Sequence, residues 1–575
     1  MTTIIGIDLG TTNSLAAVWM DGQAVLVPNV LGAYLTPSCV SIDQDGSVLV
    51  GLAAQERLQT HPERSAALFK RLMGTQQTLF LAGKPYRPEE LSAFVLKALK
   101  ADAEAFLGQA IDEAIISVPA YFSDAQRKAT RISGQLAGLR VERLINEPTA
   151  AALAYGLHQK QEESQFLVFD LGGGTFDVSI LELFEGVMEV RATAGDNFLG
   201  GEDFVHSILK AFIEHTKLPE AAQQDIHLKA ELLNQIELAK RQLSIQSTAN
   251  ISVMWQDTPY RYQLTDKEFA SISEPLLLRL RDPVARALRD SNIRTSELSS
   301  VVLAGGATRM PIVRKLVARM FGRFPAMDLN PDEVVARGTA VQAGLKMKDA
   351  ALDEIVMTDV CPYSLGVDVA KEMQFGQIID GIFSPIIERN TVVPVSRVQQ
   401  FRPLRDQQPA LHLNIYQGEA RLVKDNIKLG ELVVPLPSNN RASETMMNVR
   451  FTYDVNGLLE VEVHVDGEQQ QHRLVIEGNP GVLSEAEIAE RLTKLNRLKI
   501  HPRDQTENRT LLATAERLFQ QLRGPARIYM GDHITSFEAK IDSQDPHQIL
   551  TARKELQQVL HKMDQRDVFD QSLDE

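Results

Sequence analysis

Short apolar runs alternate with amphipathic stretches of helical spacing over roughly the first 350 residues. Four of these runs have the length of strands that are buried on both faces: Ile4–Ile7, Ala114–Val118, Phe166–Phe169 and Val301–Leu303. Each is followed by turn-forming residues and then by a helical pattern. This alternation predicts an α/β region built on a largely parallel or mixed sheet.

The pattern changes after residue 352. Apolar residues alternate with polar ones on both sides of the turn pair Asn456-Gly457, at Val449, Phe451 and Tyr453 before it and at Leu459, Val461, Val463 and Val465 after it. An Asn-Gly pair tolerates the positive φ that a tight hairpin requires. The spacing therefore predicts an antiparallel hairpin within an all-β region over 362–482, reached through a linker over 353–361.

Helical periodicity returns over 483–575. Ser484 and Glu487 form a capping box before the first of three apolar stripes, which are Ile488, Leu492 and Leu495; Leu511, Ala515, Leu518 and Leu522; and Ile549, Leu556, Val559 and Met563. We expect Gly524 to end the second helix and Asp545-Pro546 to begin the last one. The predicted order is an α/β region over 1–352, the linker, the β region and a helical region.

One motif occurs twice in the α/β region. The sequences IIGIDLGTTN, from residue 4, and LVFDLGGGTFD, from residue 167, each place an aspartate at the end of an apolar strand and then a Gly/Thr turn. The aspartates, Asp8 and Asp170, lie 162 positions apart. The repeat predicts two related α/β halves that face each other.

The residue types of the repeat suit a nucleotide triphosphate. Glycine lets backbone N–H groups approach phosphate oxygens closely, and threonine hydroxyls add donors. A carboxylate at each strand end would hold the accompanying Mg²⁺, usually through water. A single turn of this kind is also an ordinary strand–helix connection, but two copies and a third glycine turn at Gly305–Arg309 favour nucleotide binding. No G-x-x-x-x-G-K-[ST] loop follows a strand.

Composition narrows the class of protein. The 575 residues contain 60 Lys and Arg against 75 Asp and Glu, a net charge of −15, and 44% are hydrophobic. This composition excludes a mostly disordered chain and makes a general nucleic-acid binder a poor fit. Two distant cysteines, Cys39 and Cys361, match no metal spacing and are expected to be reduced thiols. Without a recognisable signal sequence or apolar span, we expect a cytoplasmic protein with no membrane partner.

Four further motifs carry a family resemblance. These are Val118–Phe122 (VPAYF), Asn146–Ala152 (NEPTAAA), Leu199–Phe204 (LGGEDF) and Asn330–Glu333 (NPDE). With the two phosphate motifs they resemble the 70-kDa heat-shock chaperones of the DnaK type, in the family's order and over nearly the whole chain. Within the family the chain is most similar to the shorter, divergent bacterial HscC type.

The resemblance implies a fold and a function. It implies a two-lobed actin-like ATPase domain, which is a duplicated ribonuclease H-like fold, at 1–352, then a β-sandwich peptide-binding domain and an α-helical lid. The expected function is that of a monomeric ATP-dependent chaperone that binds apolar segments of unfolded clients with a J-domain co-chaperone. Its cofactors would be ATP or ADP, Mg²⁺ and additionally K⁺.

Site roles follow from the resemblance, position by position. The implied catalytic residues are Lys70, Asp8, Glu147, Asp170, Asp177 and Thr175, and the three aspartates would also surround Mg²⁺. The implied nucleotide contacts are Gly10, Thr11, Thr12, Asn13, Gly172, Gly173, Gly174, Gly200, Gly201, Glu237, Lys240, Arg241, Ser244, Gly305, Gly306, Arg309 and Asp332. Without the resemblance, Lys70 would be read as a solvated helix lysine, and Glu237 and Lys240 as a surface ion pair.

Two more groups are implied outside the nucleotide site. Pro119, Arg127, Arg143 and Asp359 would connect the nucleotide site to the linker, and Arg143, Asn146, Thr149 and Asp359 would face the J-domain protein. The implied peptide site comprises Val367, Ala370, Phe401, Leu404, Leu411 and Leu413. Leu411 replaces the smaller valine of typical members, so the pocket should be narrower. From residue type alone, these apolar side chains could equally be the core of the β region.

Three departures from the family pattern are visible. The chain is short between Lys70 and the motif Arg87–Glu90, the linker Ile355–Thr358 lacks an unbroken Leu/Val run, and the sequence stops at Glu575 without a long tail. We therefore expect weaker linker docking and do not transfer the usual nucleotide-exchange factor. Two other readings stay open: a metabolite kinase or filament-type ATPase of the same fold, and a non-hydrolysing exchange factor for other chaperones.

Overall fold

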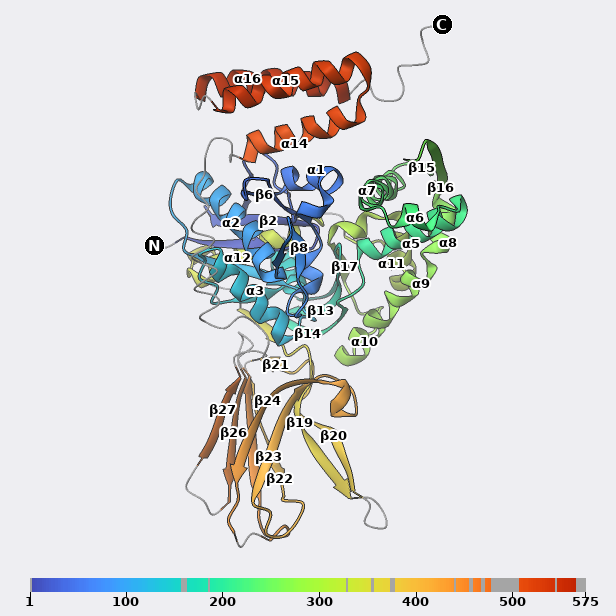
Figure 1. The fold of residues 1–575 in the computed structure, drawn as a ribbon. Helices are drawn as coiled ribbons and strands as arrows, with labels where there is room; N and C mark the ends of the chain where they lie inside the picture. The colour runs from blue at the N-terminus through green and yellow to red at the C-terminus, as the bar shows by residue number, and fades with distance from the viewer. Residues whose placement is uncertain are drawn as a thin grey trace.

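The computed structural model describes residues 3–156, 163–184, 187–326, 329–352, 356–372, 378–393, 395–438, 441–453, 459–466, 471–476, 506–542 and 546–564. The predicted helix start at Ser484, the turn at Asn456-Gly457, Ile355 and Asp545 lie outside these ranges. Figure 1 shows the α/β region in the middle of the molecule, the β region below it and the C-terminal helices above it.

The first central sheet carries the first copy of the repeated motif. Its strand order is β11-β10-β1-β2-β3, with β4 beside β2. β1 runs parallel to β10 and antiparallel to β2. The bounds are β1 Ile4–Asp8, β2 Asn13–Met20, β3 Gln23–Leu26, β4 Thr36–Pro37, β10 Glu113–Val118 and β11 Leu144–Asn146. The predicted runs Ile4–Ile7 and Ala114–Val118 are confirmed as buried strands.

The second central sheet repeats this arrangement. β12 runs parallel to β17 and antiparallel to β13, which pairs with β14. The bounds are β12 Glu163–Leu171, β13 Phe176–Phe184, β14 Val187–Asp196 and β17 Ser300–Ala304. The order of strands and their directions match those of β10-β1-β2-β3, as two related halves require. The predicted runs Phe166–Phe169 and Val301–Leu303 are confirmed as strands.

Two helices join the halves. α4 (Glu147–Gly156) and α12 (Val334–Lys346) pack against each other and against strands of both sheets. Their contact is close, because a Cβ at Gly338 would lie 1.7 Å from the carbonyl oxygen of Ala150. Their small and branched side chains form one apolar cluster with Ile115, Phe166 and Val302. This pair therefore sets the separation of the two phosphate turns.

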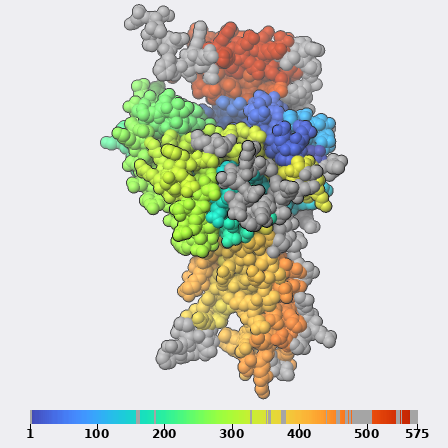
Figure 2. All heavy atoms as spheres, turned by 180° about the vertical axis from the view of Figure 1, so that it is seen from behind, coloured from blue at the N-terminus to red at the C-terminus, as the bar shows by residue number. Residues whose placement is uncertain are grey.

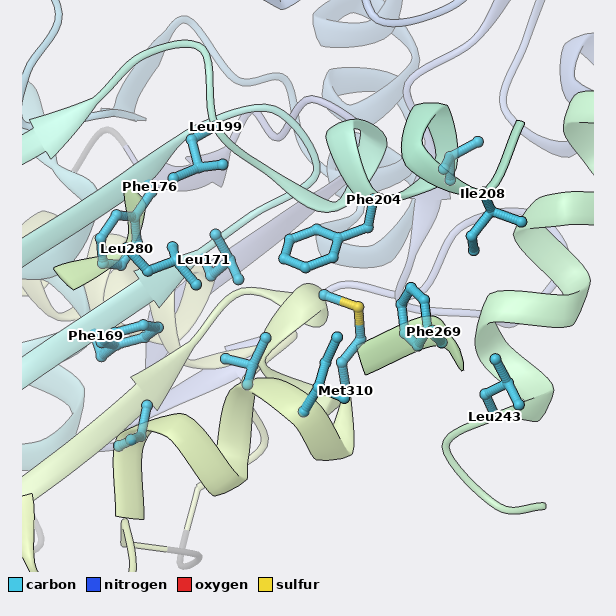
Figure 3. Close-up of a cluster of buried hydrophobic side chains, with 14 of the residues drawn as sticks. Phe169, Leu171, Phe176, Leu199, Phe204, Ile208, Leu243, Phe269, Leu280 and Met310 are labelled. Carbon is cyan, nitrogen blue, oxygen red and sulfur yellow. The ribbon is translucent and has the colours of Figure 1, made fainter. Parts of the chain in front are cut away.

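Outer elements cover each half. The first half carries β5 Val40–Ile42, β6 Val48–Val50, α1 Leu52–Thr60, β7 Ser65–Ala66, β8 Leu79–Leu81, β9 Lys84–Tyr86, α2 Pro88–Leu107 and α3 Asp124–Leu136. The second carries α5 Gly201–Thr216, α6 Glu220–Gln223, α7 Ile226–Gln242, β15 Thr248–Trp255, β16 Thr258–Thr265, α8 Asp266–Ile272, α9 Glu274–Arg279, α10 Arg281–Ser291 and α11 Pro311–Phe321. Phe169, Phe176, Phe204 and Phe269 gather in the core of the second half (Figure 3).

The segment predicted as a linker is partly a strand. β18 (Val356–Val360) adds to the second central sheet parallel to β14, with Met357 opposite Met188. β21 (Val392–Val393) follows at the edge, antiparallel to β18. The β region is thereby joined to the α/β region through a continuous sheet.

The β region contains two facing antiparallel sheets. One has the order β20-β19-β23-β24 and the other β22-β25-β26-β27. The bounds are β19 Leu365–Glu372, β20 Ile378–Ile387, β22 Val395–Phe401, β23 Ala410–Gln417, β24 Ile427–Pro435, β25 Met447–Tyr453, β26 Leu459–Val465 and β27 Gln471–Ile476. The predicted hairpin is confirmed as β25 and β26, whose alternate apolar residues are buried between the sheets.

The C-terminal helices pack together and against α1. They are α14 Thr506–Gln521, α15 Gly524–Asp542 and α16 Pro546–Asp564. Arg517 of α14 pairs with Glu56 of α1 at 2.5 Å, and Arg509 donates to the Val48 carbonyl at 2.7 Å. Figure 2 shows from behind how the C-terminal helices, in red, lie against the α/β region. The predicted helix end at Gly524 was wrong, because α14 ends at Gln521 and Gly524, with a left-handed φ of 60°, begins α15.

Candidate functional site

Three carboxylates from the repeated strands meet between the two halves. Asp8 is the last residue of β1, and Asp170 and Asp177 stand opposite each other across β12 and β13. The hydroxyl of Ser117, on β10, donates to Asp8 Oδ1 at 2.9 Å. The sheet registers therefore fix the backbone from which each carboxylate projects.

A buried ion pair stands beside these carboxylates. Lys70 Nζ lies 2.6 Å from Glu147 Oε1, and the two side chains are 5% and 10% exposed. Lys70 comes from the short turn Phe69–Leu72, and Glu147 is the first residue of α4. The Lys70 ammonium also lies over the Phe122 ring, 5.7 Å from its centroid. A cation is thus held in a dry site that is rich in negative charge.

The electrostatics of this cluster favour a bound cation. Burial and the neighbouring Glu147 raise the pKa of Asp177 to about 8, and the same two causes raise the pKa values of Asp8 and Asp170. Asp170 Oδ2 is buried without a hydrogen-bond partner among the described residues. A divalent cation would reverse these shifts, since it stabilises the ionised carboxylates. The donor set therefore fits Mg²⁺.

The three aspartates suit an ion that they reach through water rather than one that they bind directly. Within the described ranges, no three His, Cys, Asp or Glu side chains are arranged to hold a metal directly. Mg²⁺ commonly keeps several waters and uses one or two carboxylates together with phosphate oxygens. The aspartates would thus reach the ion mainly through water.

The two glycine turns face each other closely. A Cβ at Gly173 would lie 1.9 Å from Thr12 Oγ1, and one at Gly174 would lie 2.8 Å from Thr11 Cγ2. A Cβ at Gly10 would meet the Asn13 carbonyl oxygen at 2.1 Å. Side chains are thus excluded by contact at these positions, and the turns from the two halves form one cradle of backbone and hydroxyl groups.

The residues expected to contact adenosine lie next to one another beside the two glycine turns. Lys240 Nζ, on α7, donates to the Gly201 carbonyl at 3.1 Å and pairs with Glu237 at 2.6 Å. Arg241 pairs with Glu237 at 2.7 Å, and Ser244 lies exposed just beyond α7. A Cβ at Gly201 would lie 3.3 Å from Ala307 Cβ, so the turn Gly305–Arg309 adjoins these residues.

An ion pair lies at the end of the turn Gly305–Arg309. Arg309 Nη2 lies 2.6 Å from Asp332 Oδ2, and a Cβ at Gly306 would lie 2.8 Å from Asp332 Oδ1. The structure therefore links the expected phosphate and adenosine residues into one continuous group through these contacts.

Sequence reasoning missed several polar groups of the site. Arg71 Nη2, from the first half, lies 3.2 Å from Asp203 Oδ1 of the second half, and its stem would contact a Cβ at Gly174. Ser38 Oγ donates to the Gly10 carbonyl at 2.8 Å and so stiffens the first turn. The only sequence signals are that Arg71 follows Lys70 and that Asp203 lies within the LGGEDF motif. Nothing local identifies Ser38 or Ser117.

A chain of hydrogen bonds leads from the carboxylates to β18. The Tyr121 N–H donates to Asp177 Oδ1 at 3.2 Å. Arg127 donates to the carbonyl of Ala120, in the same peptide group, at 2.9 Å and to Asn146 Oδ1 at 2.7 Å. Asn146 Nδ2 donates in turn to Asp359 Oδ2 at 2.8 Å.

Other residues of the expected relay lie along this chain. Pro119 comes directly before the Ala120–Phe122 segment, and the Pro119 carbonyl accepts from the Phe122 N–H at 3.1 Å. Arg143 is largely buried near Asp359, and burial lowers the pKa of its guanidinium. Thr149 is buried in α4. Hydrogen bonds therefore connect the backbone next to Pro119 with Asp359 through Arg127 and Asn146.

The β region makes its own contacts with the second half. Arg389 pairs with Asp290 of α10 at 2.7 Å and with Glu419 at 2.6 Å. The Thr193 N–H donates to Asn390 Oδ1 at 2.9 Å. Tyr363 also packs against Tyr121 of the first half, with ring centroids 4.5 Å apart and ring planes tilted by 50°. Arg389, Asp290, Thr193, Asn390 and Tyr363 were not singled out from the sequence, because the contacts between the two regions join residues more than 90 positions apart.

The residues expected to bind peptide differ in exposure. Val367 and Leu413 are buried in the core of the β region, and Phe401 and Leu411 are half-buried against it. Ala370 and Leu404 are exposed, Leu404 to 44%. The six residues thus range from the core of the β region to its surface.

A comparison with protein families bears on the whole chain. The family model described as Hsp70 protein matches residues 4–80 and 76–575. The chain belongs to the Hsp70 family. Members of this family are ATP-dependent chaperones that hydrolyse ATP, bind ATP and ADP with Mg²⁺, and act on unfolded clients with co-chaperones. A search of the described helices for a long, apolar membrane-spanning segment finds no candidate.

Proposed function

We propose that this Hsp70 family member is an ATPase whose nucleotide state controls its affinity for short apolar peptide segments. ATP would hold the lid open and speed peptide exchange, and hydrolysis to ADP and phosphate would close the lid over the peptide. The observation that carries this proposal is the hydrogen-bond chain from Asp177 through Tyr121, Arg127 and Asn146 to Asp359, because it joins the nucleotide cleft to the β region.

The proposal assigns domains at 1–352, 362–482 and 483–575, with 353–361 as the linker between the first two. The apolar clusters within the ATPase, β and helical regions support these divisions. We further propose that the chain belongs to the HscC-like members of the family. The short segment between Lys70 and the Arg87–Glu90 motif supports that narrower placement.

Lys70 and Glu147 are proposed to act on the attacking water and the γ-phosphate. A buried ammonium 2.6 Å from a carboxylate can exchange that partner for a phosphate oxygen and neutralise charge that develops in phosphoryl transfer. Glu147 and Asp177 would then orient the water, and Thr175 would supply a hydroxyl beside the phosphate turn. Electrostatics and positioning are what this reaction mainly requires of a protein.

Mg²⁺ would supply charge neutralisation and a template for the phosphates when bound. Asp8, Asp170 and Asp177 would hold its waters, and Ser117 would keep the Asp8 carboxylate in place. Potassium is proposed as a further ion at the phosphates. The shifted pKa values of the three aspartates support a cation in this part of the cleft.

The backbone N–H groups of Gly10–Asn13 and Gly172–Gly174 are proposed to bind the phosphates from the two halves. Gly200 and Gly201 would border the same site, and Gly305, Gly306, Arg309 and Asp332 would close the adenosine side. Glu237, Lys240 and Ser244 would address ribose and base, while Arg241, exposed at the edge of α7, would stack on adenine.

The β region is proposed to bind an extended apolar segment at Val367, Phe401, Leu411 and Leu413. Ala370 and Leu404 would arch over the peptide. The half-buried state of Phe401 and Leu411 supports this role, because such side chains can contact a ligand without losing their own packing. A J-domain protein is proposed to dock on Arg143, Asn146, Thr149 and Asp359.

The decisive experiment is ATP turnover with an apolar peptide library and candidate J-domain proteins, with and without exchange factors. The proposal expects both additions to raise turnover. A chain that hydrolyses ATP without any response to peptide would instead support a kinase or filament-type ATPase. A chain that binds ATP without measurable steady-state turnover would support a non-hydrolysing exchange factor.

A further inference from the structure

The charge of the chain is unevenly distributed, and one segment is positively charged although the chain as a whole is negative. Residues 274–323, which include α9, α10 and α11, contain ten Lys and Arg against four Asp and Glu, in a chain of net charge −15. Figure 1 shows these helices on the side of the molecule opposite α2 and α12. The proposed nucleotide and peptide sites account for few of these cations.

Many of the cations in this segment already have partners. Arg279 pairs with Asp196 at 2.6 Å, Arg294 pairs with Glu297 at 2.5 Å, and Arg286 donates to the Tyr121 hydroxyl at 2.9 Å. Four others have no hydrogen-bond or ion-pair partner among the described residues: Arg281 and Arg289 on α10, and Lys315 and Arg319 on α11. All four are exposed.

A hollow of about 660 Å³ lies between these helices. Its floor is apolar, since Val284 and Phe321 are 2% and 6% exposed and Met320 and Leu288 are half-buried. Arg281 and Arg319 stand at its rim with Arg279 and one carboxylate, Asp282. A volume between about 300 and 1,000 Å³ is typical of ligand sites, and this one combines an apolar floor with a surplus of guanidinium groups.

The unpartnered cations extend beyond the hollow along both helices. Arg281 and Arg289 are eight positions apart on α10, and Lys315 and Arg319 are four apart on α11, so each pair shares a helix face. A small anion would meet only the two guanidiniums at the rim. An extended acidic segment would meet Arg281 and Arg319 at the rim while one apolar side chain filled the hollow.

We propose that α10 and α11 form a second peptide-docking site, for an acidic segment of a partner protein that carries one large apolar side chain. Carboxylates of the segment bind Arg281 and Arg319, for which guanidinium geometry is well suited. The apolar side chain packs on Val284 and Phe321. The site differs from the proposed client site in location and in the charge of the peptide it selects.

The test uses the full chain with ADP and a fluorescein-labelled heptapeptide of glutamates and aspartates around a central phenylalanine. We expect saturable binding by fluorescence anisotropy that weakens as NaCl is raised from about 50 to 300 mM. The double variant Arg281→Glu/Arg319→Glu should lose at least about tenfold in affinity, since two charge-assisted contacts are removed. Replacing the central phenylalanine with alanine should also weaken binding.

Matched controls separate this site from the others. Arg261→Glu, a charge reversal at an exposed residue of β16 in the same half that does not line the hollow, should leave binding unchanged, and basal ATP turnover should be the same in every variant. Excess leucine-rich peptide should not displace the probe, and displacement would mean that the acidic peptide occupies the β region instead. The competition with leucine-rich peptide also distinguishes a failure of the proposed acidic-peptide site from a failure of the proposed client site.

Four results would overturn the proposal. The first three are no saturable binding, equal binding by the wild type and the double variant, and equal loss in Arg261→Glu. A fourth is a single-stranded oligonucleotide that competes for the same arginines with equal affinity, because the hollow would then serve a nucleic-acid polyanion.

Discussion

The Tyr363 hydroxyl donates a hydrogen bond to the main-chain carbonyl of Tyr121 at a distance of 2.7 Å. Tyr363 belongs to the segment that leads from β18 into the β region, and Tyr121 belongs to the ATPase region. The Tyr121 N–H donates to Asp177, its carbonyl also accepts from Asn197, and its ring packs against that of Tyr363 at a tilt of 50°. A residue that binds one of the three clustered aspartates is thus held directly by the segment that leads into the β region.

Tyr363→Phe keeps the ring contact and removes one hydrogen bond of the docked arrangement. We expect it to weaken docking by about 1 kcal/mol, or about fivefold in the docking equilibrium. Fluorescence energy transfer between dyes on the ATPase and β regions, in the presence of ATP, measures this change. Tyr416→Phe, a half-exposed tyrosine of β23, is the matched control. Equal docking in the two variants would show that the hydroxyl contributes nothing.

Lys70→Ala removes the cation that stands among four carboxylates. ATP should still bind, because the backbone turns and the residues expected to contact adenosine are intact. Hydrolysis should fall by roughly 10²–10³-fold, the typical effect of removing one preorganised charge or donor from a transition state. Single-turnover hydrolysis and a separate nucleotide-binding titration give the two quantities. Lys267→Ala, on exposed α8, should change neither. Normal single-turnover hydrolysis in Lys70→Ala would sink the assignment.

Leu411→Val should broaden the range of peptides bound. The change removes one methylene from a half-buried side chain of β23 and enlarges the proposed pocket, whose selectivity for a substrate Leu or Ile should relax by about 1–3 kcal/mol. Binding to a peptide array measures the profile. Leu429→Val makes the same chemical change in the buried core on β24 and should reduce stability without altering preference. An unchanged array for Leu411→Val counts against the pocket.

The contact of α14 with α1 predicts a charge-swap result. Glu56→Arg and Arg517→Glu should each loosen the C-terminal helices from the ATPase region, because a half-buried pair becomes a like-charge pair. The double swap should restore part of the contact, by about 0.5–1 kcal/mol. Hydrogen exchange of α1 amides reports the contact in all four proteins. If the double variant does not restore the contact between α14 and α1, then Glu56 and Arg517 do not stabilise it as an ion pair.

Asp124 predicts a pH dependence of stability. It is 6% exposed, and burial raises the pKa of its carboxyl from 3.8 to about 6 despite nearby Arg127 and Arg131. The folded state holds the Asp124 proton more tightly than the unfolded state does. Proton binding at Asp124 therefore stabilises the fold fully below about pH 4, and this stabilisation is lost as the pH rises through about 6. Asp124→Asn should remove it, raising the thermal midpoint at pH 7.5 more than at pH 4.5. Asp532→Asn, at an exposed carboxylate of α15, should not. Equal effects of Asp124→Asn at both pH values would contradict the shift.

The repeated motif was enough to predict the central sheets. A strand, an aspartate and a glycine turn are local signals, and the second copy predicts the matching half. The hairpin of β25 and β26 was equally visible, because alternate residues must face one core. The end of α14 was misplaced, since a glycine after an apolar stripe can stop one helix or separate it from the next.

The polar contacts of the site could not be read in the same way. Lys70 and Glu147 are 77 positions apart, so their ion pair was visible only through family resemblance. Arg71, Ser38 and Tyr363 have no local pattern, because their roles depend on which distant backbone the fold brings to them. The docking of α14 on α1 joins residues 461 positions apart, and such a distant pairing leaves no periodic pattern in the sequence.

The central claim is that the nucleotide controls peptide binding. It is tested most directly by the dissociation rate of a labelled apolar peptide from the full chain after mixing with ATP or with ADP in a stopped-flow instrument. The account predicts dissociation at least about fivefold faster with ATP, the lower end of typical coupling between two sites, and loss of this difference in Asn146→Ala. Equal dissociation rates with ATP and ADP in the wild-type chain would contradict it.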